Sequence, residues 1–373
     1  MKKITISLFV IIFFMVFFCG ISVGLYEIFP YQFLNLVKDT IFADNSRSQQ
    51  DLFDKIVTYS IIGIDNESDI LKKREALIHF IWKTESIPSS YPDIIEKNIF
   101  DERYSDIDNL KQIDKFTITM KHKVNSIVYL FHPKQSNDHL ILYHQGHAGD
   151  FINGKQSIDY FLKNGYYVVA FSMPLLGMNE QPIIEIENLG VVKLFNHDQL
   201  QYLESENFTS ISYFLTPIAY TLNYLDDHYN FKTYSMVGLS GGGWASTIYP
   251  AIDTRISKSF AVAGSLPISL RLNAQDIGDY EQLHFELYKI ANYPELYIMS
   301  SYGNDREFVQ IFNKYDTCCF AGTLYEHYEY EIKKVVSNLN NGKFSVILDD
   351  THNEHKISGH TLKLVHENIS LDN

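Results

Sequence analysis

A serine between glycines, in the stretch Gly238-Leu239-Ser240-Gly241-Gly242, is a candidate nucleophile in this 373-residue chain. The apolar run 234–239 before it is typical of a buried strand, and residues 242–252 suit a helix, so Ser240 is expected at a strand-to-helix turn. Such a turn lifts the hydroxyl above the edge of a sheet, and the glycines avoid collisions across the bend. The first N–H groups of the helix would face an oxyanion beside the serine. The setting predicts nucleophilic catalysis, and the alternative is a glycine-rich turn with an idle serine.

The elements that would position this serine are short apolar strands alternating with helices, which begin at Phe116. Two strand-like segments at its start predict an antiparallel hairpin that leads into a mostly parallel sheet covered by helices on both faces. Ligands bind at the carboxyl ends of the strands in such sheets. Residues 174–207 break the alternation, and they are either a lid insertion over these ends or a surface excursion. The strands are predicted within 115–124, 125–133, 138–150, 166–174, 234–239, 257–266, 295–302 and 343–350, with helices at 153–164 and 208–227.

The stretch GLSGGGWASTIYPAIDTRISKSFAVAG, residues 238–264, resembles the α/β-hydrolase superfamily. The similarity is to its branches of acetyl xylan esterases, dienelactone hydrolases and prolyl-oligopeptidase-like enzymes. It extends from about Phe116 to the C-terminus, so residues 116–373 are expected to form the catalytic domain. The resemblance implies an α/β-hydrolase fold and a serine mechanism, but it is uninformative about the substrate.

The same resemblance implies a triad in the order serine, acid, histidine, with the acid after the seventh strand of the fold. Taking residues 295–302 as that strand makes Asp305 the acid by position. The alternatives are Asp316 and the pair Asp349 and Asp350, and Asp305 could also be a solvated loop carboxylate.

The base is expected after the eighth strand, which is predicted at 343–350. His355 immediately precedes the last amphipathic helix and is the favoured base, with His352 as the alternative. His360 and His366 fall on that helix and are expected to be surface or packing residues.

The loop YHQGHAGD, residues 143–150, resembles the family's HG-type motif with Gln145 in place of a glycine. Backbone N–H groups of His147 and Gly241 are the expected oxyanion hole. His144 and His147 lie three residues apart without a neighbouring carboxylate pair or cysteine, so no metal site is expected there. No organic cofactor is implied.

The N-terminus carries Lys2 and Lys3 followed by an uncharged segment, Ile4–Tyr26. About 20 apolar residues can cross a bilayer as a helix, and the lysines favour a cytoplasmic N-terminus. Residues 1–29 are therefore predicted to be an uncleaved signal anchor, with the catalytic domain outside the cytoplasm. A cleaved signal peptide is the alternative.

Residues 30–115 are predicted to be a mostly helical extension, because 68–86 spaces its apolar residues on one helical face. It could be a stalk, a lid or a segment packed on the main domain.

Composition indicates which classes of binding partner are excluded and whether the chain can form a core. The formal charge of −14 argues against nucleic acid, and 46% hydrophobic residues supply a substantial core. Cys19, Cys318 and Cys319 form no disulfide framework, and the adjacent pair is interpreted as ordinary thiols.

Together these features predict a membrane-anchored serine hydrolase that cleaves a carboxylic ester outside the cytoplasm. The substrate would be a small-molecule, carbohydrate or lipid ester. One alternative is a serine peptidase of prolyl-oligopeptidase-like type, although no propeller-like repeats precede the domain. Another is an inactive scaffold or binding protein on the same fold. The sequence does not indicate an oligomeric state.

Overall fold

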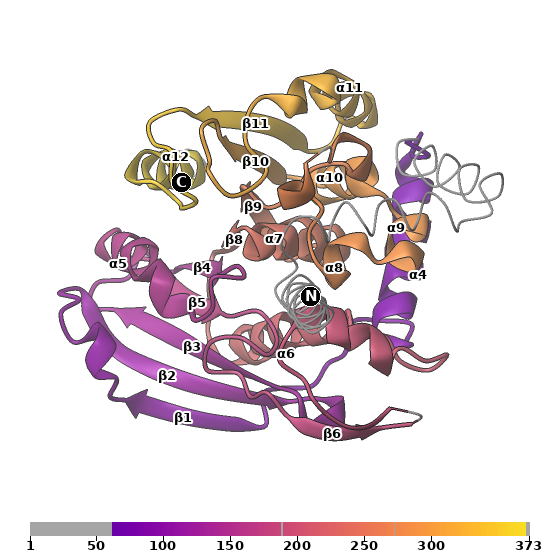
Figure 1. The fold of residues 1–373 in the computed structure, drawn as a ribbon. Coiled ribbons are helices and arrows are strands. Elements are labelled where there is room, and N and C mark those ends of the chain that lie inside the picture. The colour runs from indigo at the N-terminus through magenta and orange to yellow at the C-terminus, as the bar shows by residue number, and fades with distance from the viewer. Residues whose placement is uncertain (1–61, 188, 272, 371–373) are drawn as a thin grey trace, which may run out of the picture. The chain divides into compact units, whose positions relative to one another are not determined.

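A computed structural model describes residues 62–370 of the chain, apart from 188 and 272 (Figure 1). Their centre is a nine-stranded sheet in the order β1-β2-β3-β5-β4-β8-β9-β10-β11. The strands are β1 (Ile94–Ile99), β2 (Leu110–Thr119), β3 (Asn125–Pro133), β4 (His139–His144), β5 (Tyr167–Phe171), β8 (Thr233–Leu239), β9 (Ile256–Val262), β10 (Glu307–Asn313) and β11 (Lys343–Asp349).

The sheet is parallel from β5 to β11 and antiparallel at its other end. β5, β4, β8, β9, β10 and β11 pair in parallel, whereas β1, β2 and β3 form an antiparallel meander that joins β5. The predicted hairpin and mostly parallel sheet are confirmed. Because His144 pairs with Gly238 at the ends of β4 and β8, the loops that follow these two strands are neighbours.

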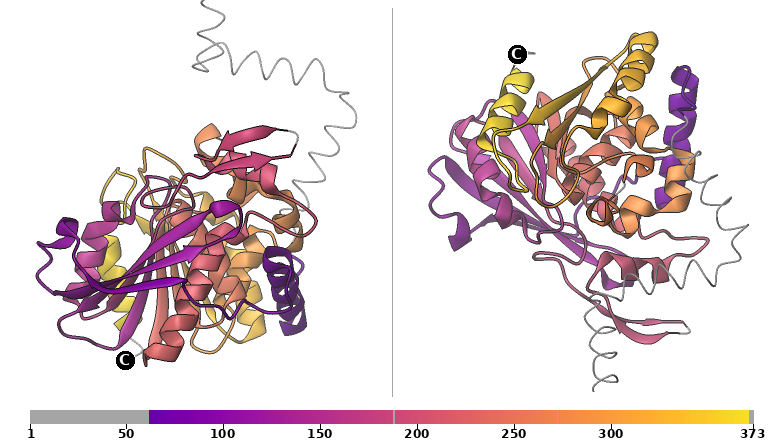
Figure 2. Two further views of the ribbon diagram at one scale, coloured as in Figure 1. Left: turned by 90° about the horizontal axis from the view of Figure 1, so that it is seen from below. Right: turned by 45° about the horizontal axis from the view of Figure 1, so that its top comes forward.

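Helices cover both faces of the sheet, and each face has its own apolar core (Figures 1 and 2). Every residue of β3 and β4 is buried, as two-sided coverage requires. One face carries α4 (Glu67–Trp82), α6 (Ser212–His228), α7 (Gly241–Ile252), α10 (Tyr293–Ser301) and α11 (Glu329–Leu339). The other carries α5 (Lys155–Lys163) and α12 (Gly359–Ser370), and two short helices, α8 (Tyr280–Leu283) and α9 (Phe285–Ile290), precede α10.

The segment 295–302, predicted as a strand, is instead part of helix α10. Asn292 caps this helix: its side chain accepts a hydrogen bond from the Glu295 N–H at 3.1 Å. The Glu295 side chain in turn accepts a hydrogen bond from the Asn292 N–H at 3.0 Å. All nine residues of the helix are buried, so its sequence lacks the polar face that marks most helices. The strand that borders β9 is β10, which begins at Glu307.

The extension predicted for 30–115 also needs correction where the structure describes it. Helix α4 packs on the main domain, where Lys73 Nζ lies 3.1 Å from Glu295 Oε2 and Arg74 Nε donates to the Ala251 carbonyl at 3.0 Å. Between α4 and residue 115 the only helix is the short 3₁₀ helix Glu102–Tyr104, and β1 and the start of β2 belong to the central sheet. The sheet therefore begins at Ile94 rather than at Phe116. Residues 30–61 lie outside the described residues.

The predicted anchor, Ile4–Tyr26 within 1–29, also lies outside the described residues. In the part of the chain that the structure does describe, none of the helices combines the length and hydrophobicity needed to cross a membrane.

Candidate active site

Ser240 occupies the predicted turn between β8 and α7. Its backbone has φ 57° and ψ −124°, a strained conformation for a residue with a side chain, and its N–H donates to the Val262 carbonyl at 2.9 Å. The glycines beside it are required by close packing. A Cβ atom on Gly238 would lie 2.0 Å from the Gly242 oxygen, and one on Gly242 would lie 2.0 Å from the His144 oxygen. The turn holds a partly exposed serine at the carboxyl edge of the sheet.

The structure pairs His355 with Asp316, a runner-up in the sequence analysis. Asp316 follows the carboxyl end of β10, and its Oδ2 lies 2.8 Å from His355 Nδ1. The Cys318 N–H donates to Asp316 Oδ1 at 2.8 Å, and Asn313 Nδ2 donates both to Asp316 Oδ2 at 3.1 Å and to the Lys356 carbonyl at 3.0 Å. Burial acts to raise the pKa of Asp316, but these donors hold it below its usual range. The carboxylate is therefore ionised, and it orients the imidazole with its proton on Nδ1.

Asp305, the acid predicted by position, lies at the opposite end of β10. It is exposed in the turn that precedes Glu307, and the seven residues of the strand span about 20 Å. The structure therefore does not bring Asp305 to His355. The prediction failed because the seventh strand was placed on 295–302, which is helical. Asp305 instead borders a cleft of about 290 Å³ with Lys258, Arg306, Glu307, Gly342 and Lys343.

Asp349 organises the loop that carries His355. It is the fully buried last residue of β11, and its Oδ1 accepts hydrogen bonds from the Thr351 N–H at 2.9 Å and hydroxyl at 2.6 Å. Its Oδ2 accepts from the hydroxyls of Ser358 and Thr361, which lie at the start of α12. Burial opposes ionisation, but these donors hold the pKa of Asp349 well below its ordinary value. Asp349 thus ties both ends of the loop to the sheet.

His352, the alternative base, faces Asp349 instead of Asp316. Its Nε2 lies 3.5 Å from Asp349 Oδ2 without a hydrogen bond, and its Nδ1 accepts from the Glu354 N–H at 3.2 Å. This arrangement favours His355 as the base.

Asp349→Asn is expected to lower the free energy of unfolding at pH 7 by about 2 kcal/mol, because buried donors lose a charged acceptor. A depressed folded-state pKa contributes stability above the unfolded value of about 3.9, and that stability is lost as pH falls through the folded pKa. The difference from wild type should therefore shrink below about pH 4. Urea unfolding at several pH values measures it, with Asp350→Asn as the control because Asp350 is exposed. An equal loss in both variants would contradict this role.

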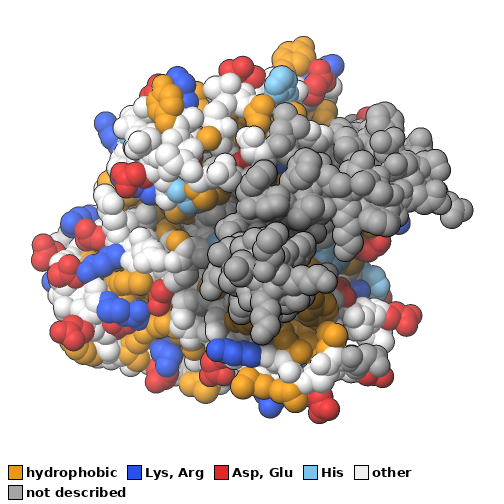
Figure 3. Space-filling model, viewed as in Figure 1, with side chains coloured by type: hydrophobic (Ala, Val, Ile, Leu, Met, Phe, Trp, Pro, Cys, Tyr) orange, Lys and Arg blue, Asp and Glu red, His pale blue; other side chains and the backbone are white. Residues whose placement is uncertain are grey.

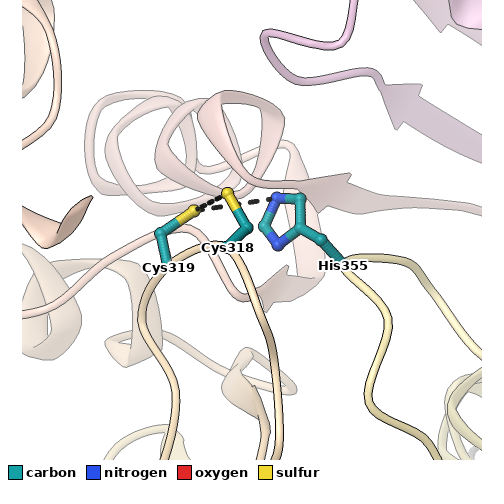
Figure 4. Close-up of side chains that lie close together, drawn as sticks. All are labelled: Cys318, Cys319 and His355. Atoms are coloured by element: carbon teal, nitrogen blue, oxygen red, sulfur yellow. Dashed lines mark hydrogen bonds between the residues drawn. The ribbon is translucent and has the colours of Figure 1, made fainter.

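The adjacent cysteines lie beside the other nitrogen of the His355 ring (Figure 4). Cys319 Sγ is 4.0 Å from His355 Nε2 and 2.7 Å from Cys318 Sγ. Among the described residues no hydrogen bond joins His355 Nε2 to Ser240 Oγ. This absence is compatible with catalysis, because such hydrogen bonds commonly form only when substrate is bound. Burial raises the pKa of the Cys319 thiol, whereas Cys318 is exposed.

Alkylation of Cys318 by a bulky maleimide should therefore inhibit the enzyme. The adduct would crowd the base and pull on the backbone N–H that holds Asp316, and misplacement by about 1 Å can cost about a hundredfold in rate. Cys319 should react slowly because its thiolate is disfavoured. The measurement is residual activity against reagent concentration for wild type and Cys318→Ser. Inhibition that is equal in the two proteins would show that another group is responsible.

The loop after β4 stands over the serine, as the oxyanion-hole prediction requires. A Cβ atom on Gly146 would lie 2.6 Å from Ser240 Cβ and 3.1 Å from the Gly241 nitrogen. The backbone of His147 follows directly, and its N–H has no acceptor among the described residues. His144 is buried and stacks on Phe171, and burial lowers its pKa to about 4, so it is a neutral packing residue.

The insertion 174–207 contacts this site through His197. It forms a hairpin, β6 (Ile183–Ile186) and β7 (Gly190–Lys193), and then the 3₁₀ helix η4 (His197–Leu203). The buried His197 ring lies against His147. The hairpin and the chain just after it expose Ile183, Val191 and Phe195, and apolar side chains gather along the lower edge of Figure 3, where Figure 1 labels β6. The insertion is thus both a neighbour of the site and a surface feature.

Comparison with known proteins identifies the fold but not a close relative. No family model matches the sequence, and no curated protein matches it. Acetyl xylan esterase 1 from Thermoanaerobacterium sp. JW/SL YS485 matches in structure with a TM-score of 0.54 at 14% identity, over 86% of this chain and 98% of that one. An acetyl xylan esterase from Paenibacillus sp. R4 matches with a TM-score of 0.52 at 12% identity, over 85% and 98%. The chain has the α/β-hydrolase fold.

In this α/β-hydrolase fold, Ser240, Asp316 and His355 follow β8, β10 and β11 in the order serine, acid, histidine. Sequence reasoning missed Asn313, which links Asp316 to the loop that carries His355. No local pattern indicated that role, since an amide at the end of a buried strand has many structural uses.

Proposed function

We propose that the protein is a serine hydrolase that cleaves carboxylic esters with Ser240 as nucleophile, His355 as base and Asp316 as acid. The observation that carries the proposal is the strained serine turn at the same sheet edge as the buried Asp316 and the His355 ring that it contacts. The acetyl xylan esterases of similar fold support an ester substrate, of a small molecule or a carbohydrate, rather than a peptide.

In the proposed mechanism His355 Nε2 takes the proton of the Ser240 hydroxyl as the oxygen attacks the ester carbonyl. Asp316 keeps the Nδ1 proton in place and stabilises the imidazolium that forms. The backbone N–H groups of Gly241 and His147 donate to the tetrahedral oxyanion. The imidazolium protonates the leaving alcohol, and water activated by His355 then releases the acid.

An ester series and an active-site probe test this proposal. The purified chain should hydrolyse nitrophenyl acetate, butyrate or longer acyl esters faster than peptide anilides, and a fluorophosphonate should label it. Faster cleavage of the anilides would favour the peptidase alternative. Absence of labelling would favour the scaffold, because only an activated serine reacts.

We also propose that Ile4–Tyr26 anchors the protein and that the hydrolase domain faces outward. The length of the uncharged segment and the preceding lysines support this topology. Protease added to intact spheroplasts should then digest the domain, whereas full protection would refute the outward orientation.

A further inference from the structure

Four potential metal ligands from three distant segments converge beside the serine turn. His147 comes from the loop after β4, His197 from η4 in the insertion, and Asp279 and Glu281 from the start of α8. One donor atom from each of them lies within 4.8 Å of the others. Glu281 is completely buried and His197 nearly so, whereas the Asp279 side chain is about half exposed.

Five of the six separations between these groups are close to the edges of a zinc tetrahedron. Zn–N and Zn–O bonds of about 2.0–2.2 Å place neighbouring ligands about 3.3–3.6 Å apart. His147 Nε2 lies 3.2 Å from His197 Nδ1, 3.0 Å from Glu281 Oε1 and 3.1 Å from Asp279 Oδ2. His197 Nδ1 lies 3.1 Å from Glu281 Oε2 and 3.8 Å from Asp279 Oδ2. All four donor atoms lie within 4.8 Å of one another, close enough for one ion to contact them together.

Hydrogen bonds alone do not satisfy every close contact in this cluster. His147 Nε2 carries at most one hydrogen but has three close neighbours. The other nitrogen of His197, Nε2, lies 3.0 Å from the Pro174 carbonyl, which can only accept, so it carries a hydrogen. In the neutral ring Nδ1 then presents a lone pair to the cluster. A ligating histidine that donates its second N–H to a carbonyl is the usual arrangement in metal sites.

We propose that His147, His197, Asp279 and Glu281 bind one divalent transition-metal ion, with zinc preferred. Two carboxylates balance its charge, and two imidazole ligands argue against magnesium and calcium, which favour oxygen ligands. Sequence analysis expected no metal at His144 and His147 because no carboxylate pair is near them in the chain. The fold supplies that pair from residues more than 130 positions away.

Four protein ligands complete a tetrahedron, which indicates a positioning role. The ion would tie the insertion to the loop after β4 and to α8. It would also fix the His147 ring, whose Nδ1 would lie 2.8 Å from a Cβ atom on Gly241. This role rests on the proposed function, whereas the binding itself does not.

Metal content of the full-length chain, purified in detergent without chelator, tests the site. We expect about one zinc ion per chain, and after chelation one equivalent of Co²⁺ should give the visible absorption of a tetrahedral site. Asp279→Asn and Glu281→Gln should weaken zinc binding by more than the roughly 10- to 100-fold that loss of an outer-shell partner costs. Asp198→Asn is the matched control, because this exposed carboxylate adjoins His197 without joining the cluster.

Asp279→Asn decides the result if Glu281→Gln does not fold, because Asp279 is half exposed and its loss leaves no buried charge unpaired. Wild-type chain with less than about 0.1 equivalent of zinc after reconstitution would overturn the proposal, as would unchanged affinity in Asp279→Asn. Bound zinc without esterase activity would count against the proposed function alone. Esterase activity in a chain that cannot bind zinc would count against the metal site alone.

Discussion

Ser240→Ala is expected to lower kcat for ester hydrolysis by up to about a million-fold and to abolish fluorophosphonate labelling. The loss is large because the nucleophile and base act as a unit, so either is ineffective alone. Alanine must adopt the same positive φ of 57°, and the serine hydroxyl makes no hydrogen bond among the described residues. The free energy of unfolding should therefore change little, which thermal denaturation can verify.

Ser246→Ala is the matched control for this experiment. Ser246 lies on α7, is fully buried, and its hydroxyl has no hydrogen-bond partner among the described residues. Its variant should keep both labelling and turnover. Turnover that survives in Ser240→Ala, or labelling lost equally in both variants, would contradict the assignment of the nucleophile.

Local sequence patterns were sufficient to predict the serine turn because its causes are local. The glycines at 238 and 242 are required by contacts within the turn and with the adjoining strand β4. The apolar runs that became β4, β5, β8 and β11 were recognisable because strands covered on both faces are short and continuously apolar.

The same rule produced the error over the acid. Helix α10 is buried on all sides, so residues 295–302 have the continuous apolar character of a buried strand. The sequence did contain a helix-start pattern that argues against a strand. Asn292 is a capping residue, Pro294 suits the first turn of a helix, and Glu295 lies three positions after Asn292. With the strand at Glu307–Asn313, the aspartate that follows it is Asp316 rather than Asp305, and Asp316 is the acid of the proposed triad.

The histidine and carboxylate cluster was beyond sequence reasoning for a different reason. His147, His197 and Glu281 belong to segments whose meeting depends on the path of the insertion and on the chain between β9 and α10. The spacing of these residues along the chain does not indicate that they are close in space. Only the folded structure shows their proximity.

Asp316→Asn is expected to lower kcat by about ten-thousand-fold while leaving the fold intact. The carboxylate accepts the His355 Nδ1 proton across 2.8 Å, which leaves Nε2 free to take the proton of Ser240. An asparagine amide can instead donate to Nδ1, and the ring then carries its proton on Nε2, where it cannot act as a base. As with Asp349→Asn, donors lose a charged acceptor, so about 2 kcal/mol of stability should be lost as well, and kcat is compared where the variant is folded.

Asp305→Asn is the control that separates the two candidate acids. Asp305 is exposed with φ 55°, a backbone conformation that asparagine tolerates well, so kcat should stay within about twofold of wild type. The measurement is kcat for both variants on the same ester, with unfolding curves to show that both remain folded. If Asp305→Asn were inactive and Asp316→Asn active, the acid would have to act from the amino end of β10. That outcome would require a rearrangement of the whole strand, because the seven residues of β10 lie between Asp305 and Asp316, the residue that contacts His355.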